Sequence, residues 1–196
     1  MMVSITRSLR SASLLLWLLA STLPTCAETI SATQSNTDFV DGQLAVSTRF
    51  KIKLPSGLRT ALTQGVPLTF RLEFELTRPR LAAYYLSLKA WFGSHADIPF
   101  RLSYQPLTYR YRVSIGSLSN DYPSLDDALH TVGAVQDWRV LNPGELSDYT
   151  PDDVAGRVRL ALDVGELPKP FRLNALGSAD LTLSSNWVPL DIKGKH

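Results

Sequence analysis

Apolar and polar side chains alternate along several stretches of the chain, which is the pattern of strands that bury one face. Between Leu68 and Leu76 every second residue is large and apolar, and the residues between them are Thr, Arg or Glu. A shift of this strand by one residue would expose all of the apolar groups, so its register is well defined. The same pattern predicts about eight strands, at residues 44–52, 66–76, 81–92, 98–104, 107–115, 138–141, 158–164 and 181–187.

Two short segments have helical spacing instead. Apolar residues at 58–62 are followed by Gly65, which suits the end of a helix. Ser124 suits the N-cap of a second helix at residues 125–132, which Gly133 would end. Helices and strands do not alternate in the order typical of a parallel sheet. We therefore predict an all-β fold, an antiparallel β-sandwich or partly open barrel of about eight strands with one or two short helices.

The first 27 residues have the layout of a secretory signal peptide. Arg7 and Arg10 precede an uncharged apolar run at residues 11–23, and Thr-Cys-Ala follows shortly after it. The run is about a dozen residues long, shorter than the roughly 20 that span a bilayer as a helix. We predict cleavage after Ala27. Two alternatives stay open, namely membrane anchoring through lipidation of Cys26, and a leader that remains uncleaved.

Export bears on both domain organisation and chemistry. It separates the protein from cytoplasmic nucleotides and nucleic acid, so we expect no nucleotide cofactor, no nucleic-acid partner and no other cofactor. Cys26 is the only cysteine, so a chain cut after Ala27 has no thiol for a disulfide or a metal. Residues 28–38 are polar and without periodicity, which predicts a flexible segment before a single β-rich domain at residues 39–196.

Charge is balanced overall but unevenly distributed. The net charge of +2 comes from Arg7 and Arg10, because the rest of the chain has 18 basic and 18 acidic residues. Residues 49–112 contain eleven Lys or Arg and three acids, whereas residues 116–196 contain seven and twelve. Either the two parts pair with each other across the fold, or they form an electropositive face for an anionic partner.

The strongest candidate for a binding site is a stretch in which aromatic and basic residues are interleaved. Such side chains suit a glycan, an anionic lipid head group or an acidic protein patch. The alternative is that the rings belong to the core and the arginines line a solvated face. The candidate binding residues are Arg78, Arg80, Tyr84, Tyr85, Trp91, Arg101, Arg110 and Arg112.

An enzymatic alternative rests on Glu73 and Glu75, which share the outward face of one strand about 7 Å apart. That separation suits the carboxylate pair of an envelope glycan hydrolase. Arg157 and Arg159 form an equivalent outward pair on a later strand, which instead favours ion pairing across a sheet. Histidines are few and their spacing predicts no metal site. The leading hypothesis is a non-enzymatic binding or accessory module, and a purely structural envelope component is a further alternative.

Several blocks occur in a fixed order along the chain: residues 61–70, 101–104, 107–111 and 124–129 with Trp138, then residues 157–163 leading to 167–170. Together they resemble a family of exported proteobacterial proteins, the domain of unknown function 4390. The resemblance implies a periplasmic or envelope protein and assigns no activity, cofactor or catalytic residue. It also implies an envelope protein or membrane surface as the partner, with a membrane sensor kinase as one candidate.

Overall fold

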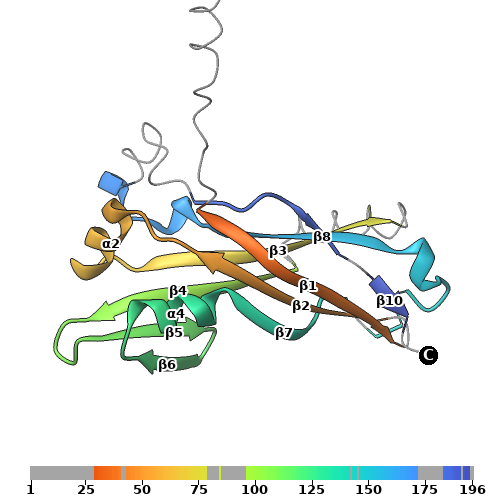
Figure 1. Cartoon of the computed structure of the whole chain (residues 1–196), viewed down its shortest axis with the longest axis horizontal. Coiled ribbons are helices and arrows are strands. Elements are labelled where there is room, and N and C mark those ends of the chain that lie inside the picture. The colour runs from red at the N-terminus through yellow and green to blue at the C-terminus, as the bar shows by residue number, and fades with distance from the viewer. Residues whose placement is uncertain are drawn as a thin grey trace, which may run out of the picture.

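A computed structural model shows two β-sheets that pack on a shared hydrophobic core (Figure 1). Neighbouring strands are antiparallel except for β1 and β10, which are parallel. This arrangement confirms the predicted all-β, sandwich-like fold. The structure describes residues 29–40, 43–78, 84, 96–141, 143–144, 146–171, 183–190 and 192–194.

The six-stranded sheet has the order β6-β5-β4-β3-β8-β9, and the four-stranded sheet has the order β10-β1-β2-β7. Within the described residues, two α-helices and two short 3₁₀ helices connect strands. The strands of the first sheet are β3 (Leu68–Arg78), β4 (Asp97–Gln105), β5 (Arg110–Ile115), β6 (Leu118–Tyr122), β8 (Ala155–Leu162) and β9 (Val188–Pro189). The strands of the second are β1 (Ile30–Val40), β2 (Gln43–Ile52), β7 (Ala134–Arg139) and β10 (Ile192–Gly194). The helices are α2 (Ser56–Thr63), α4 (Leu125–Val132), η1 (Pro151–Asp153) and η2 (Val164–Glu166).

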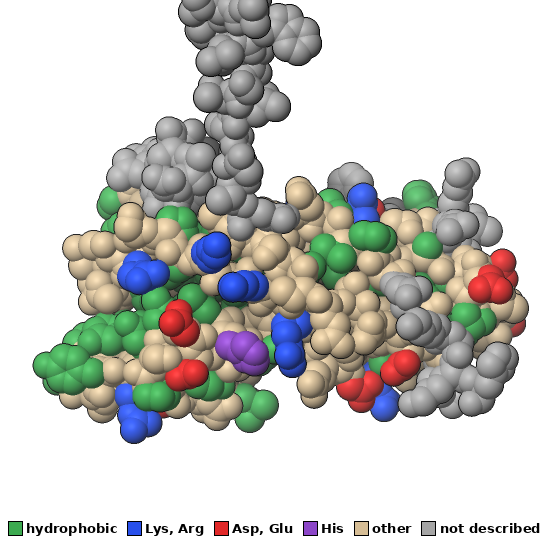
Figure 2. Space-filling model, in the orientation of Figure 1, with side chains coloured by type: hydrophobic (Ala, Val, Ile, Leu, Met, Phe, Trp, Pro, Cys, Tyr) green, Lys and Arg blue, Asp and Glu red, His purple; other side chains and the backbone are tan. Residues whose placement is uncertain are grey.

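The core lies between the sheets and has the register that the alternation predicts. On β3 the apolar residues from Leu68 to Leu76 are all buried, and Phe70 is fully so. Strand β2 alternates in the same way over residues 49–52, with Phe50 and Ile52 buried and Arg49 and Lys51 exposed. Basic side chains consequently gather on the outer face of the four-stranded sheet (Figure 2).

Helix α4 forms for the reasons that its sequence suggests. The Ser124 hydroxyl accepts a hydrogen bond from the Asp127 backbone N–H at 3.1 Å. At the other end, the Phe50 N–H donates to the Gly133 carbonyl at 2.7 Å. A Cβ on Gly133 would lie 2.2 Å from the Phe50 carbonyl oxygen, so only glycine allows the helix to approach β2 this closely.

Strand β1 corrects the expectation that residues 28–38 form a flexible segment. Residues 30–40 pair along nearly the whole of β2, with a bulge after Ala32. Among residues 30–39 of this strand only Ile30 and Thr37 are buried, and most of the other side chains there are polar and at least partly exposed. Its stability as a strand comes from backbone pairing and not from an apolar face, which explains why the sequence pattern failed here.

Three other predicted strands differ from the structure or lie largely outside its described residues. The strand expected at 107–115 begins only at Arg110, because Tyr109 has a φ of 53° and belongs to the preceding turn. The segment expected as a strand at 181–187 hydrogen-bonds irregularly along β8 over its described part, and regular pairing occurs only at β9. The strand predicted at 81–92 lies outside the described residues, apart from Tyr84, which is helical and contradicts the prediction at that position.

Candidate interaction surface

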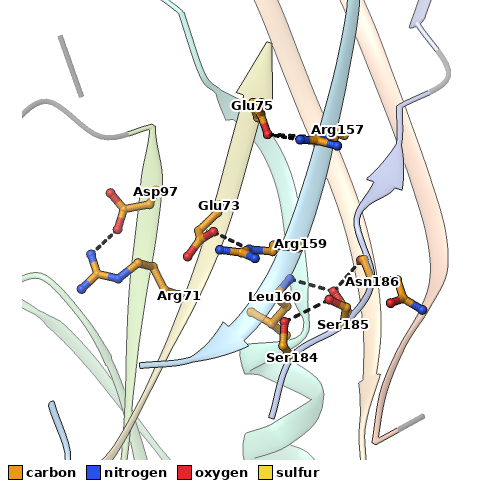
Figure 3. Close-up of polar contacts among 10 residues, drawn as sticks. All are labelled: Arg71, Glu73, Glu75, Asp97, Arg157, Arg159, Leu160, Ser184, Ser185 and Asn186. Atoms are coloured by element: carbon orange, nitrogen blue, oxygen red, sulfur yellow. Dashed lines mark hydrogen bonds and ion pairs between the residues drawn. The ribbon is translucent and has the colours of Figure 1, made fainter. Parts of the chain in front are cut away.

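The outer face of the six-stranded sheet carries a ladder of ion pairs between β3 and β8 (Figure 3). Glu73 lies opposite Arg159 and Glu75 opposite Arg157 in the strand register. The Arg159 Nε donates to the Glu73 carboxylate at 2.6 Å, and the Arg157 Nε donates to the Glu75 carboxylate at 2.8 Å. The expected ion pairing across the sheet is therefore confirmed, and both carboxylates of the alternative hydrolase pair are engaged by arginines.

Arg71 extends this ladder at the end nearer β4. Its guanidinium donates one hydrogen bond to Asp97 and another to Asp163, the latter at 2.6 Å. The two carboxylates raise the pKa of Arg71 above its ordinary value, mainly through the hydrogen bonds to Asp163 and then Asp97. Asp163 belongs to the acidic C-terminal part of the chain. The prediction that the basic and acidic parts pair across the fold is thus confirmed for this arginine.

Trp187 covers the other end of the ladder. The guanidinium carbons of Arg157 and Arg159 lie 4.7 and 4.6 Å from its ring centroid, within the range of a cation–π contact. The segment that carries Trp187 is held to β8 by the Ser185 hydroxyl, which accepts from the Leu160 N–H at 3.0 Å (Figure 3). This aromatic and basic cluster was not among the predicted site residues.

The arginines of β4 and β5 are in a different situation. Arg112 forms a two-point ion pair with Asp121 of β6, at 2.7 and 3.0 Å. The pair lowers the pKa of Asp121 and raises the pKa of Arg112, in each case mainly through the hydrogen bonds between them. Arg101 and Arg110 are exposed and form no ion pair within the described part of the chain, although the charge of Arg110 adds slightly to the lowering at Asp121.

Large apolar side chains are exposed at both ends of this hairpin pair. Leu107 and Tyr109 in the β4–β5 turn are 97% and 76% exposed, and Leu118 at the start of β6 is 74% exposed, with Ile115 beside it. Strand β6 pairs with β5 on one side, and no described strand pairs with its other side. We call β6, these four apolar residues, Arg101 and Arg110 the edge surface.

The family model described as a domain of unknown function (DUF4390) matches residues 27–191. The chain belongs to the DUF4390 family. No curated protein and no solved structure is similar enough to match it. The family expected from the sequence blocks is therefore confirmed.

The predicted site residues of this DUF4390 protein separate into three groups. Arg101, Arg110 and Arg112 lie on β4 and β5, on the outer face of one sheet. Arg78 ends β3 opposite Ala155, and Tyr84 is 60% exposed. Arg80, Tyr85 and Trp91 lie outside the described residues. The structure thus brings together three of the eight predicted binding residues. Near them lie the exposed apolar residues of the β4–β5 and β5–β6 turns, which were not predicted.

Two further findings concern the described residues of the DUF4390 domain. None of the helices there has both the length and the apolar composition needed to cross a membrane. No group of three or more His, Cys, Asp or Glu side chains converges there as a possible metal site.

Proposed function

We propose that this DUF4390 protein is an exported, non-enzymatic accessory module that binds a protein of the cell envelope through its edge surface. The observation that carries the proposal is the presence of exposed apolar side chains, led by Leu107 and Leu118, at both ends of β6, whose second side pairs with no described strand. A strand edge and large exposed apolar groups both favour association, and soluble proteins usually protect them.

Strand addition is the binding mode that suits this geometry. An extended segment of the partner would pair with the free side of β6. Its apolar side chains would contact Leu107 and Tyr109 at one end and Leu118 at the other. Tyr109 is held at a positive φ, a conformation that costs a non-glycine residue about 1–2 kcal/mol, and such strain is typical of functional turns.

Charge adds a preference for an acidic partner segment. Arg101 and Arg110 project from the outer face of the same hairpins, and no described carboxylate forms an ion pair with them. Free guanidinium groups near an interface speed the encounter with an acidic partner and select against basic ones. Arg112 is a weaker candidate for binding an acidic partner, because its guanidinium group already forms an ion pair with Asp121.

Localisation supports an envelope partner. Arg7, Arg10 and the apolar run to residue 23 have the order of a signal peptide, and the family match begins at residue 27, where the predicted leader ends. A membrane sensor kinase is the specific partner class that the family resemblance offers.

Affinity recovery of the exported protein from cross-linked envelopes tests the proposal. Leu107→Ser combined with Leu118→Lys removes the apolar contacts and places a charge on the edge strand. Thr60→Lys is the matched control, since it adds the same charge at an exposed position of α2 on another part of the surface. The wild type and the control should recover one common partner, and the edge variant should lose it while keeping its melting temperature.

Retention of that partner by a folded edge variant would exclude the edge surface as the binding site. N-terminal sequencing of the same preparation checks export, because cleavage after Ala27 gives a chain that begins at Glu28. A lipidated Cys26 at the N-terminus would show an anchored protein instead.

A further inference from the structure

A groove lies between strand β2 and helix α4, on the face shown in Figure 2. Its volume is about 360 Å³. It forms because β7 pairs with β2 only as far as Arg49, opposite Ala134. Beyond this point α4 replaces β7 beside β2, and the wider helix leaves room next to residues 49–52.

One wall of the groove is a single face of helix α4. Asp126, Leu129 and His130 are spaced at i, i+3 and i+4, and all three line the groove. The hydrogen bond from the Phe50 N–H to the Gly133 carbonyl holds the end of this helix against β2. Both walls are therefore parts of regular elements that backbone bonds hold together, which is typical of a preformed site.

The floor of the groove is apolar. Phe50, Ile52 and Leu129 line it, and their exposed fractions are 3%, 9% and 5%. These side chains belong to the core and show only a part of their surface to the groove. An apolar ligand group placed there would be removed from water on several sides.

The rim of the groove carries an excess of positive charge. Arg49 and Lys51 project outward from β2, and His130 lies on the opposite wall. Asp126 is the one acidic residue among those that line the groove. No ion pair among the described residues engages Arg49 or Lys51. Both cations remain available to a ligand that carries a negative charge.

We infer that this groove binds a small single-chain amphiphile with an anionic head group. The head group would lie between Arg49, Lys51 and His130, and the chain would cover Phe50 and Leu129. The volume is at the lower end of the roughly 300–1,000 Å³ of small-molecule sites, which suits one short chain and not a whole phospholipid. None of the residues that line the groove belongs to the edge surface, and this inference does not depend on the proposed partner site.

Calorimetric titration of the purified protein with decanoate tests the inference directly. Decyltrimethylammonium has the same chain with a cationic head, and acetate has a carboxylate without the chain. We expect saturable binding of one decanoate per protein. The affinity for each of the two comparison compounds should be at least about tenfold lower, because each lacks one of the two contacts.

Two variants place the site. Arg49→Glu with Lys51→Glu should weaken decanoate binding by about tenfold or more, whereas Lys53→Glu with Arg59→Glu makes the same charge change at exposed positions that do not line the groove. Thr33→Trp leaves the charge unchanged and should block binding by filling the groove, since Thr33 is exposed and lines it.

Three results would overturn the inference: no saturable binding of decanoate, equal affinity for decanoate and decyltrimethylammonium, or wild-type affinity in the folded Arg49→Glu, Lys51→Glu variant. The edge variant Leu107→Ser, Leu118→Lys should bind decanoate as the wild type does. The groove and the partner site can thus fail independently.

Discussion

The β3–β8 region and the β4–β6 region belong to one sheet but differ in how their charges are satisfied. Between β3 and β8, Arg71, Arg157 and Arg159 all hold carboxylates. On β4 and β5, Arg112 alone has such a partner among the described residues, while Arg101 and Arg110 remain exposed. A count of arginines therefore does not locate a binding face. What matters is whether a neighbouring strand places a carboxylate at the same register.

The two regions also differ in apolar exposure. The large apolar residues of β3 are buried between the sheets, whereas the turns on either side of β5 expose leucine and tyrosine to solvent. Burial stabilises the first region, and the second has apolar surface that no described residue covers.

Truncation of one large side chain in each region should change the free energy of unfolding by very different amounts. Phe70→Ala removes a fully buried ring from β3 and should lower the free energy of unfolding by about 3–5 kcal/mol. Leu107→Ala truncates a residue that is 97% exposed and should change it by less than about 0.5 kcal/mol. Urea unfolding measures both. A similar loss in the two variants would contradict the assigned register.

Removal of Arg71 should destabilise the ladder through the acids that it leaves behind. In Arg71→Met, the side chains of Asp97 and Asp163, which are 11% and 23% exposed, lose their shared counter-charge. Because both sites retain some contact with water, we expect a loss of about 1–3 kcal/mol, below that of a fully buried pair. Arg101→Met, in the unpaired region, should have almost no effect on thermal unfolding.

The two pairs of the ladder should each contribute a modest coupling. Double-mutant cycles on Glu73–Arg159 and on Glu75–Arg157 should give about 0.5–1 kcal/mol, with the first pair the stronger because it is less exposed. Adding Trp187→Ala should reduce both couplings, since its ring covers both guanidinium groups. Couplings that Trp187→Ala leaves unchanged would show that the ring only packs there.

Titration of Asp121 should report the smallest effect. Its folded-state pKa is lowered, so the stabilisation from its pair is present above the ordinary pKa and is lost as the pH falls through the folded value. Arg112→Gln should return the pKa of Asp121 toward its ordinary value. Arg110→Gln should raise it less, because that charge contributes least. Carboxyl NMR titration measures these shifts, and an unchanged value in Arg112→Gln would refute the pair.

Much of the fold follows from local pattern. The alternation on β3 predicts which residues are buried, and the same alternation places Glu73 and Glu75 outward, where Arg157 and Arg159 meet them. Ser124 and Gly133 likewise predict the ends of α4. In each case a side chain decides the local structure, and the sequence shows it.

The remaining features depend on contacts between distant segments. Strands β1 and β6 are largely polar, so their pairing with β2 and β5 leaves little trace in their own sequences. Trp187 reaches the ladder because irregular hydrogen bonds hold its segment to β8. The groove needs residues near 50 and near 130 to lie side by side. Of these features, only the position of Trp187 had a sign in the sequence, namely a large aromatic residue at the end of a predicted strand.

Hydrogen exchange at β6, in the free protein and in its complex with the recovered partner, shows whether the partner pairs with this strand. If the partner adds a strand to the edge surface, the amides of residues 118–122 on the free side of β6 should exchange at least about tenfold more slowly in the complex, since new backbone bonds protect them. The amides of β3 and β8 should keep their rates. Unchanged exchange at β6, with protection appearing on another face, would contradict the account.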